Sequence, residues 1–386
     1  MNYSNRTIGG RLLRNKGAAF GLIVIGAAIF VALTAYFIAP DPSPDANRMI
    51  VEIGGRKPGF RQQFLLIKKE KLPAPVSFWQ RLLSGREDSY NYVPIDGYAI
   101  KGDSLIVQKF VDEGVAERRA YLLTELLSGQ GGQAQNKEDR KPANGETAPV
   151  GHALQERDLP VKSRVFWLGT DKYGRDILSR LLVGVRVSLA VGLVTVLISL
   201  SLGVLLGSLA GYFRGKVDEI ILWLINVIWS IPTLLLVFAI TLMLGKGFWQ
   251  VFIAIGLTLW VNVARIIRGQ VLGVREREYV EAAKALGYSH SRILFRHILP
   301  NVMGPVWVVS ASNFASAIVI EAGLSFLGVG VQPPQPSWGL MIKENYNFII
   351  THNPMLALAP GLAIMLLVLA FNLLGNGLRD ALNVRV

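Results

Sequence analysis

One carboxylate stands inside an otherwise apolar stretch, which makes it the first candidate for chemistry. Glu321 is costly in hydrocarbon, and such a residue by default marks a functional or a paired position. At 100° per residue it shares one helix face, an arc of about 80°, with three small or polar residues. These are Ser310, Asn313 and Ala317. We expect this strip to face a partner helix or a water-filled path; the alternative is that Glu321 lies near the helix end and snorkels to the headgroups.

Other kinds of chemistry lack the residues that they need. The chain has no cysteine and only four histidines, which excludes disulfide and thiolate chemistry and argues against a His-rich metal site. Its two Gly-Lys pairs, Gly215-Lys216 and Gly245-Lys246, lack the first glycine and the hydroxyl residue of a phosphate-binding loop. We therefore expect no catalytic residue, no metal and no cofactor in this chain.

Long apolar stretches must position these residues. Of 386 residues, 51% are hydrophobic and 17% are charged, whereas soluble domains average about 25% charged residues. A bilayer-spanning helix needs roughly 20 apolar residues, and the first stretch is too long for the alternative, a signal peptide. We predict an all-α polytopic membrane protein with six transmembrane helices. They are expected at about 18–39, 187–211, 220–244, 249–267, 302–327 and 356–376.

Basic residues beside these stretches predict how the chain crosses the membrane. With the N-terminus inside, the short cytoplasmic segments hold 15 Lys and Arg residues, and the short outer loops hold only Lys246 and Lys343. Because Lys and Arg resist export, both termini are predicted to be cytoplasmic. The basic residues border the spans and do not form one face with aromatic residues, so the net charge of +13 does not indicate a nucleic-acid partner.

A polar insert separates the first two spans and, on this topology, lies outside the cytoplasm. Alternating stretches at Phe64–Ile67 and Tyr98–Phe110 predict short strands, so 45–127 is expected to be a small β-rich domain. The Gly-, Gln- and Asn-rich run at about 128–152 is typical of a flexible linker. The predicted domains are 1–40 with the first helix, the insert 41–160, and a five-helix core 161–386.

Two of the spans carry unusual residues. In the second, small residues recur every fourth position and form a strip for close helix packing: Ser199, Gly203, Gly207 and Gly211. In the third, Asn226, Trp229 and Ser230 precede Pro232, which removes a backbone hydrogen bond. We interpret this either as a bend beside a solute pathway or as an ordinary membrane-helix proline.

The longest inner loop, about 268–301, has helical periodicity that is broken by a glycine. A short amphipathic helix is expected over Glu276–Leu286, Gly287 permits a reversal, a second helix starts near Ser289, and Pro300 begins the next span. Val280, Ala283 and Leu286 are expected on one face of the first helix, with Arg277, Glu281 and Lys284 elsewhere. Such a charged pair of helices predicts a docking site for a cytoplasmic protein; the alternative is a simple connector.

The same loop resembles that of a known family. Glu281-Ala282-Ala283, then Gly287, then Leu299-Pro300 resembles the EAA loop of bacterial ABC importer permeases, with His297 where the family has Ile. Further stretches are similar to the permeases of dipeptide, oligopeptide and nickel importers, and most resemble the C-type partner of the permease pair. They are WLGTD at 167–171, GRDILSR at 174–180, Gly211-Tyr212-Phe213, Ile231-Pro232, and EAGLSFLGVGVQPP at 321–334.

The resemblance implies the type I permease fold and a coupling role for the loop, whose first helix would seat in a groove of an ATPase subunit. The coupling residues would be Tyr279, Glu281, Ala282, Ala283, Leu286, Gly287, Leu299 and Pro300. The path would be lined by the Glu321 strip together with Asn226, Trp229 and Ser230.

The resemblance also implies partners and a location. These partners are a second permease subunit in a heterodimer, two ATP-binding cassette subunits that bind ATP and Mg²⁺, an extracytoplasmic substrate-binding protein, and membrane lipid. The location would be the bacterial inner membrane, and peptides would be the cargo. Two alternatives remain open: nickel or another small solute as the cargo, and a membrane-anchored sensor or adaptor whose outer domain binds a ligand.

Overall fold

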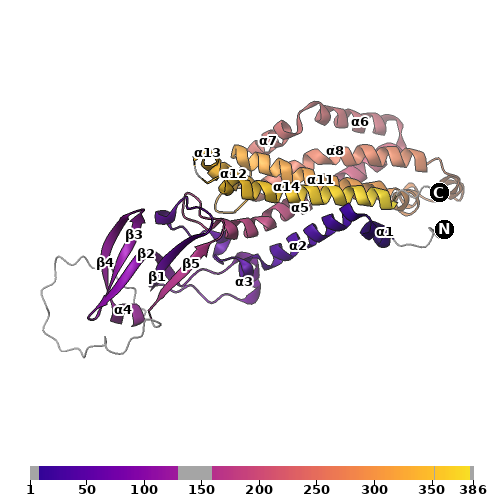
Figure 1. Ribbon diagram of the computed structural model, residues 1–386. Helices are drawn as coiled ribbons and strands as arrows, with labels where there is room; N and C mark the ends of the chain where they lie inside the picture. The colour runs from indigo at the N-terminus through magenta and orange to yellow at the C-terminus, as the bar shows by residue number, and fades with distance from the viewer. Residues whose placement is uncertain (1–7, 129–158, 352, 383–386) are drawn as a thin grey trace. The chain divides into compact units, whose positions relative to one another are not determined.

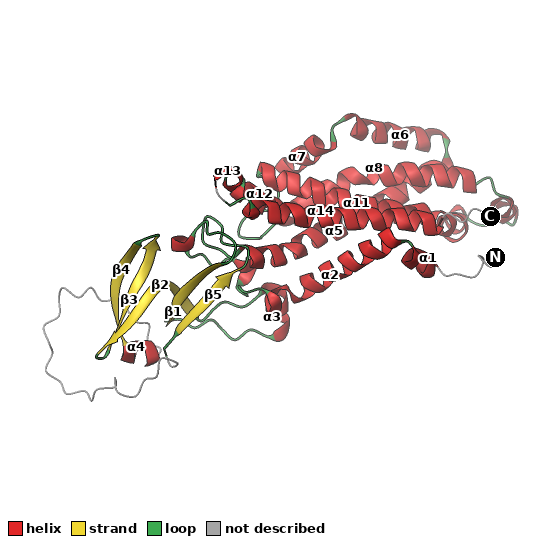
Figure 2. Cartoon of the chain, viewed as in Figure 1, coloured by secondary structure: helices red, strands yellow, loops and turns green. Residues whose placement is uncertain are grey.

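The computed structural model describes residues 8–128, 159–351 and 353–382, and it is helical apart from one sheet (Figures 1 and 2). Among the described residues, five helices are long and apolar enough to cross a membrane, or six if one bent pair counts as a single span. The prediction of a polytopic helical membrane protein is therefore confirmed. The five are α2 (Lys16–Ile38), α5 (Ile177–Phe213), α8 (Phe248–Val274), the run His290–Leu327 that ends in α11 (Leu299–Leu327), and α14 (Met355–Leu382).

The second span is longer than its apolar window indicated. Helix α5 begins at Ile177 and not near 187, and its 37 residues give a length of roughly 56 Å. Arg180 and Arg186 interrupt the apolar pattern in the first turns, but Arg180 is buried and lies within ion-pair distance of Glu344. Hydropathy therefore located the span without locating the start of the helix.

The third predicted span is a broken one. Helix α6 (Gly215–Ser230) and helix α7 (Thr233–Leu244) meet at a bend of 96°, with Ile231 and Pro232 between them. The carbonyl that Pro232 leaves without its helical donor, that of Ile228, accepts the N–H of Ile231 at 3.3 Å. The predicted interruption at Pro232 is confirmed.

Helix α8 is the central helix of the first compact unit, which comprises Met1–Leu33, Gly184–Lys343 and Leu358–Val386. In its most apolar stretch of 18 residues, 67% of the residues are buried, compared with 22–39% in the corresponding stretches of the other candidate spans. Helices α7 and α11 pack along it. Phe314 of α11 and Phe371 of α14 stack at 3.9 Å, and α11 and α14 run side by side in Figure 1.

The second compact unit, Thr34–Val183 with Glu344–Ala357, contains an antiparallel sheet in the order β4-β3-β2-β1-β5. Apolar residues fill both of its faces, with Leu65 and Leu105 on one side and Phe64 and Phe110 on the other. The strands are β1 (Phe60–Lys68), β2 (Tyr90–Lys101), β3 (Ser104–Asp112), β4 (Val115–Leu122) and β5 (Val161–Phe166). The predicted strands lie within this sheet, whose last strand follows the expected linker; that linker lies outside the described residues except for Ser128.

Shorter helices complete the described chain. Near the ends of the spans and the sheet lie α1 (Ile8–Arg14), α3 (Phe78–Ser84), α4 (Leu123–Ser128), α12 (Trp338–Asn345) and α13 (Phe348–Thr351). The loop between α8 and α11 contains α9 (Glu278–Ala285), α10 (His290–Arg292) and a π-helical segment, Ile293–Ile298.

Candidate functional site

The charged loop between α8 and α11 folds as two short helices joined at Gly287. Helix α9 ends at Ala285, and Gly287 takes a φ of +74°, the left-handed conformation that favours glycine. The hydroxyl of Ser289 then caps α10 by accepting the N–H of Arg292 at 3.4 Å. The predicted pair of helices is confirmed, although the first one starts at Glu278.

Helix α9 divides into a buried face and an exposed face. Val280 and Ala283 are buried in a cluster with residues of α5, α8 and α11. Leu286 was expected on that face, and this is wrong: it is 71% exposed, because the helix ends one residue earlier and the chain turns away. Tyr279 of α9 and Phe295 of the π-helical segment are also exposed, 45% and 60%, so large apolar side chains are exposed at both places in the loop.

The other predicted coupling residues are divided between this exposed face and the base of α11. Glu281 and Ala282 are exposed on α9, whereas Leu299 is buried and Pro300 lies in the first turn of α11. His297, which stands where the resemblance has Ile, stacks on Tyr288 with a ring separation of 5.9 Å. Phe295, in the π-helical segment, was not singled out from the sequence, which gave no face assignment for the second helix.

The loop is attached to the end of α5. Arg275 donates to the carbonyl of Tyr212 at 2.6 Å, and the Tyr212 hydroxyl bonds the His290 Nδ1 at 2.9 Å. Arg214 forms an ion pair with Glu276. The end of α5 therefore holds the segment before α9 through Tyr212 and Arg214, and the start of α10 through Tyr212.

The predicted polar strip of α11 faces neighbouring helices of its own chain. Asn313 is buried and donates to the hydroxyl of Ser199 on α5 at 3.3 Å and to the carbonyl of Leu259 on α8 at 3.4 Å. Ala317 is buried in the helical core, and Ser310 bonds the carbonyl of Val306 in its own helix. Of the two expectations for the strip, the structure therefore shows the one in which it faces neighbouring helices. That the strip also lines a path for the cargo stays a prediction.

Glu321 is held by two serine hydroxyls. It is 1% exposed, and its Oε1 accepts from Ser325 at 2.6 Å and from Ser337 at 2.7 Å. The Ser325 hydroxyl also accepts the N–H of Val331 at 3.0 Å. The alternative in which Glu321 snorkels to the headgroups is wrong, because its carboxyl group joins the end of α11 to the segment before α12. Neither serine was singled out from the sequence: the spacing of four residues between Glu321 and Ser325 is a signal that could have indicated that contact, whereas no local pattern points to Ser337.

Of the three residues singled out before Pro232, Trp229 contacts α8. The indole N–H of Trp229 donates to Asn262 at 3.3 Å, and the guanidinium of Arg265 lies 3.5 Å from the centre of the Trp229 ring. Near the other end of α6, Asp218 forms a two-pronged ion pair with Arg268, at 2.5 and 2.7 Å. Asn226 and Ser230 are exposed, and the Ser230 hydroxyl bonds the carbonyl of Val227. Trp229 therefore attaches the end of α6 to α8, and a pathway role for the three residues stays a prediction.

The strip of small residues on α5 lies against α8. A Cβ placed on Gly203 would lie 2.4 Å from the Cβ of Val263, and one on Gly207 would lie 2.4 Å from the carbonyl oxygen of Ala264. A Cβ on Gly211 would lie 2.8 Å from the carbonyl oxygen of Arg268. Because no side chain fits, the two backbones meet as the packing interpretation predicted.

The WLGTD and GRDILSR stretches meet in a buried network of charges in the second unit. The Nε–H of Arg175 donates to the carboxylate of Asp171 at 2.6 Å, and the Nη2 of the same guanidinium donates to Glu344 at 2.7 Å. Burial raises the pKa of the Asp176 carboxyl above its ordinary value, despite hydrogen bonds from Ser179. Such a buried network adds little net stability, since removing its charges from water is costly. Among the described residues, no group of three His, Asp or Glu is placed to hold a metal ion.

Comparison with known proteins identifies the family. Residues 203–386 match the binding-protein-dependent transport system inner membrane component, and residues 6–52 match the N-terminal TM domain of oligopeptide transport permease C. The oligopeptide transport system permease protein OppC of Bacillus subtilis is 41% identical over 233 residues, which are 60% of this chain and 76% of that protein. This chain belongs to the family of binding-protein-dependent transport permeases that includes OppC.

The permease has similar relatives in other systems. The glutathione transport system permease protein GsiD of Pectobacterium atrosepticum is 42% identical over 58% of this chain and 74% of its own length. Among solved structures, an inward-facing MetNI methionine ABC transporter covers 53% of this chain and 97% of its own, with 18% identity and a TM-score of 0.45. The permease is a multi-pass inner-membrane protein, and its sheet lies between the two matched stretches of sequence.

Proposed function

We propose that this permease is the C-type subunit of an ATP-driven importer of peptides, pairs with a second permease subunit, and forms one side of the path. The observation that carries the proposal is the identity of about 41% to OppC, a permease of an oligopeptide transport system. The relatives named above also serve glutathione, itself a small peptide, so we propose peptides as the cargo in place of nickel. The sensor or adaptor alternative does not account for the match over the permease core.

For the topology, we propose that α6 and α7 together form one span, which gives six in the type I arrangement. With 15 basic residues beside the inner ends and two beside the outer ends, both termini are cytoplasmic and the insert 41–160 is extracytoplasmic. The helices from α5 to α14 that follow the sheet then form the transport domain, and 1–40 supplies the first span.

For energy coupling, we propose that α9 docks on an ATP-binding cassette subunit. Exposed Tyr279, Leu286 and Phe295 supply apolar contact area, and the buried pair Val280 and Ala283 transmits movement to α5, α8 and α11. The permease is not an ATPase: two partner subunits bind ATP and Mg²⁺, and an extracytoplasmic binding protein delivers the cargo. No cofactor is required in the permease itself.

Substituting Gly287 tests this docking role. A Cβ at Gly287 meets no atom within 4 Å, so Gly287→Val acts only through its left-handed backbone, at a cost of roughly 1–2 kcal/mol. We expect normal amounts in the membrane with loss of peptide uptake and of peptide-stimulated ATP hydrolysis. Gly102→Val is the matched control, since Gly102 has a φ of +64° and equally open surroundings in the β2–β3 turn. Normal uptake by Gly287→Val, or equal loss in both variants, would contradict the coupling role.

A further inference from the structure

Helix α3 leaves its apolar side chains uncovered, although it belongs to a well-packed unit. Ser77 caps the helix by accepting the N–H of Gln80 at 3.2 Å, and none of the helix residues is buried. Trp79 is 69% exposed, and Phe78 and Leu83 are each 63% exposed. Phe78, Trp79, Leu82 and Leu83 fall within roughly 140° on one side of the helix, opposite Gln80 and Ser84. Water is a poor environment for such a face, which indicates a partner.

The position of α3 is fixed by the end of span α2. The rings of Phe37 and Phe78 lie 5.6 Å apart, and the Arg81 guanidinium lies 4.6 Å from the centre of the Phe37 ring. At the end of α3, a Cβ on Gly85 would lie 2.9 Å from the ring of Tyr36, and the N–H of Arg86 donates to the carbonyl of Pro42 at 2.8 Å. Since Phe37 is the penultimate residue of α2, these contacts hold α3 at the level where the span leaves the hydrocarbon.

The surrounding charges match a lipid surface. Residues 69–86 contain four basic residues and one acidic residue, and Leu72 in the same segment is 55% exposed. Basic side chains bind anionic headgroups, and tryptophan favours the boundary between headgroups and hydrocarbon. The basic residues are Lys69, Lys71, Arg81 and Arg86.

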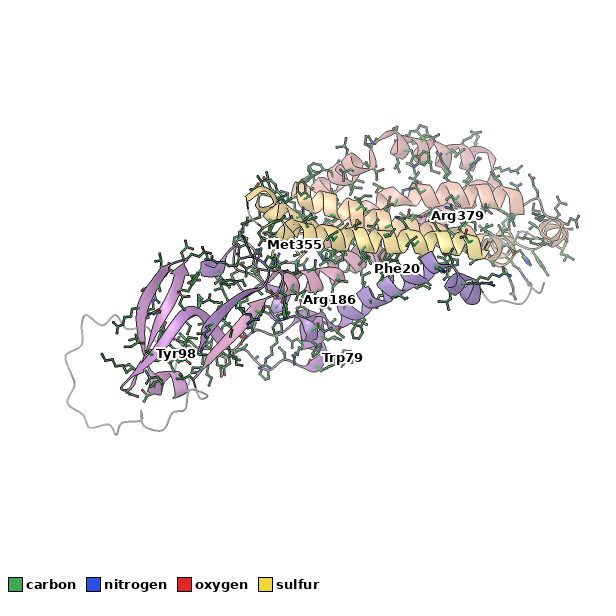
Figure 3. The ribbon with its side chains drawn as sticks, in the orientation of Figure 1. Phe20, Trp79, Tyr98, Arg186, Met355 and Arg379 are labelled. Atoms are coloured by element: carbon green, nitrogen blue, oxygen red, sulfur yellow. The ribbon has the colours of Figure 1, made fainter. Side chains whose placement is uncertain are left out.

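We propose that residues 69–86, centred on α3, form an interfacial membrane anchor whose Phe78 and Trp79 insert at the headgroup level. Figure 3 labels Trp79 on α3, beside the end of α2. The anchor holds the insert at a fixed height on the membrane surface. It does not depend on the cargo or on which side of the membrane the insert lies.

The absence of cysteine from the chain allows a direct test. In the variant Trp79→Cys, the new thiol carries an environment-sensitive fluorophore. The labelled full chain is reconstituted in vesicles of zwitterionic and anionic phospholipid, and a spin label on the lipid headgroups quenches any fluorophore that lies at their level. Phe30→Cys on α2 is the hydrocarbon reference and Val115→Cys on β4 the aqueous one; both native residues are exposed. We expect several-fold stronger quenching at position 79 than at 115, and weaker quenching for Gln80→Cys on the polar side of α3.

Quenching at position 79 no stronger than at 115 would overturn the anchor. Leu72→Cys gives an independent reading if the label at 79 perturbs α3, and it should follow the same pattern. The competing occupant is a protein. If the label at 79 escapes the lipid quencher but becomes shielded from an aqueous quencher when the substrate-binding protein is added, α3 is a protein-docking site and the proposal fails.

Discussion

Replacing Glu321 separates an anchoring role from a path-lining role. Its Oε1 is the acceptor for two serine hydroxyls, at 2.6 and 2.7 Å, and Ser325 and Ser337 are both fully buried. Glu321→Ala leaves both hydroxyls without this acceptor. At about 1–2 kcal/mol for each buried group deprived of its partner, the expected loss of unfolding free energy is about 3 kcal/mol.

The assay compares chemical unfolding of the purified permease in detergent with peptide uptake in cells. Glu321→Gln keeps an acceptor oxygen and should lose about 1 kcal/mol, and Ser337→Ala, which removes one donor, should lose a similar amount. In the double variant Glu321→Ala with Ser337→Ala, the two losses should not add, because they share one interaction. Uptake should fall only as far as the amount of folded protein falls.

One result would refute this reasoning. If Glu321→Ala unfolds at the same denaturant concentration as the unaltered permease and yet abolishes uptake, the carboxyl group serves the passage of cargo and does not anchor the segment before α12.

Two further predictions concern packing and pH. Gly207→Ala places a Cβ 2.4 Å from the carbonyl oxygen of Ala264 and should lower the free energy of unfolding by about 2 kcal/mol. Gly269→Ala on α8 is the control: its Cβ would meet no atom within 4 Å, so it should be neutral or stabilise by up to about 1 kcal/mol. Equal effects of the two variants on thermal unfolding would contradict the close approach of α5 to α8. Because burial raises the folded-state pKa of Asp176, its ionisation disfavours the folded state, so stability should fall as the pH rises above about 4 towards that raised pKa. Asp176→Asn should remove this fall in unfolding measured against pH, and an unchanged profile would show that another group causes it.

Local patterns in the sequence were sufficient for the architecture. Apolar stretches of membrane length, the helices on both sides of Gly287, the helix start near Ser289 and the break at Pro232 each depend on a few neighbouring residues, so they can be predicted from the order of residues along the chain. The small-residue strip on α5 likewise predicted close packing without naming α8 as the neighbour.

Tertiary structure decided what depends on residues far apart in the chain. Apolarity could not place the start of α5, since Arg180 is compensated by Glu344, and periodicity could not show that Leu286 is exposed, since one turn residue decides it. Ser337 reaches Glu321 only because the intervening loop returns to the end of α11. By itself, the sequence determined which segments form helices long and apolar enough to cross a membrane, and where the charged loop turns. The partners of its buried polar groups, and the position of α3 beside α2, were decided only by folding, because burial and contact depend on distance in space.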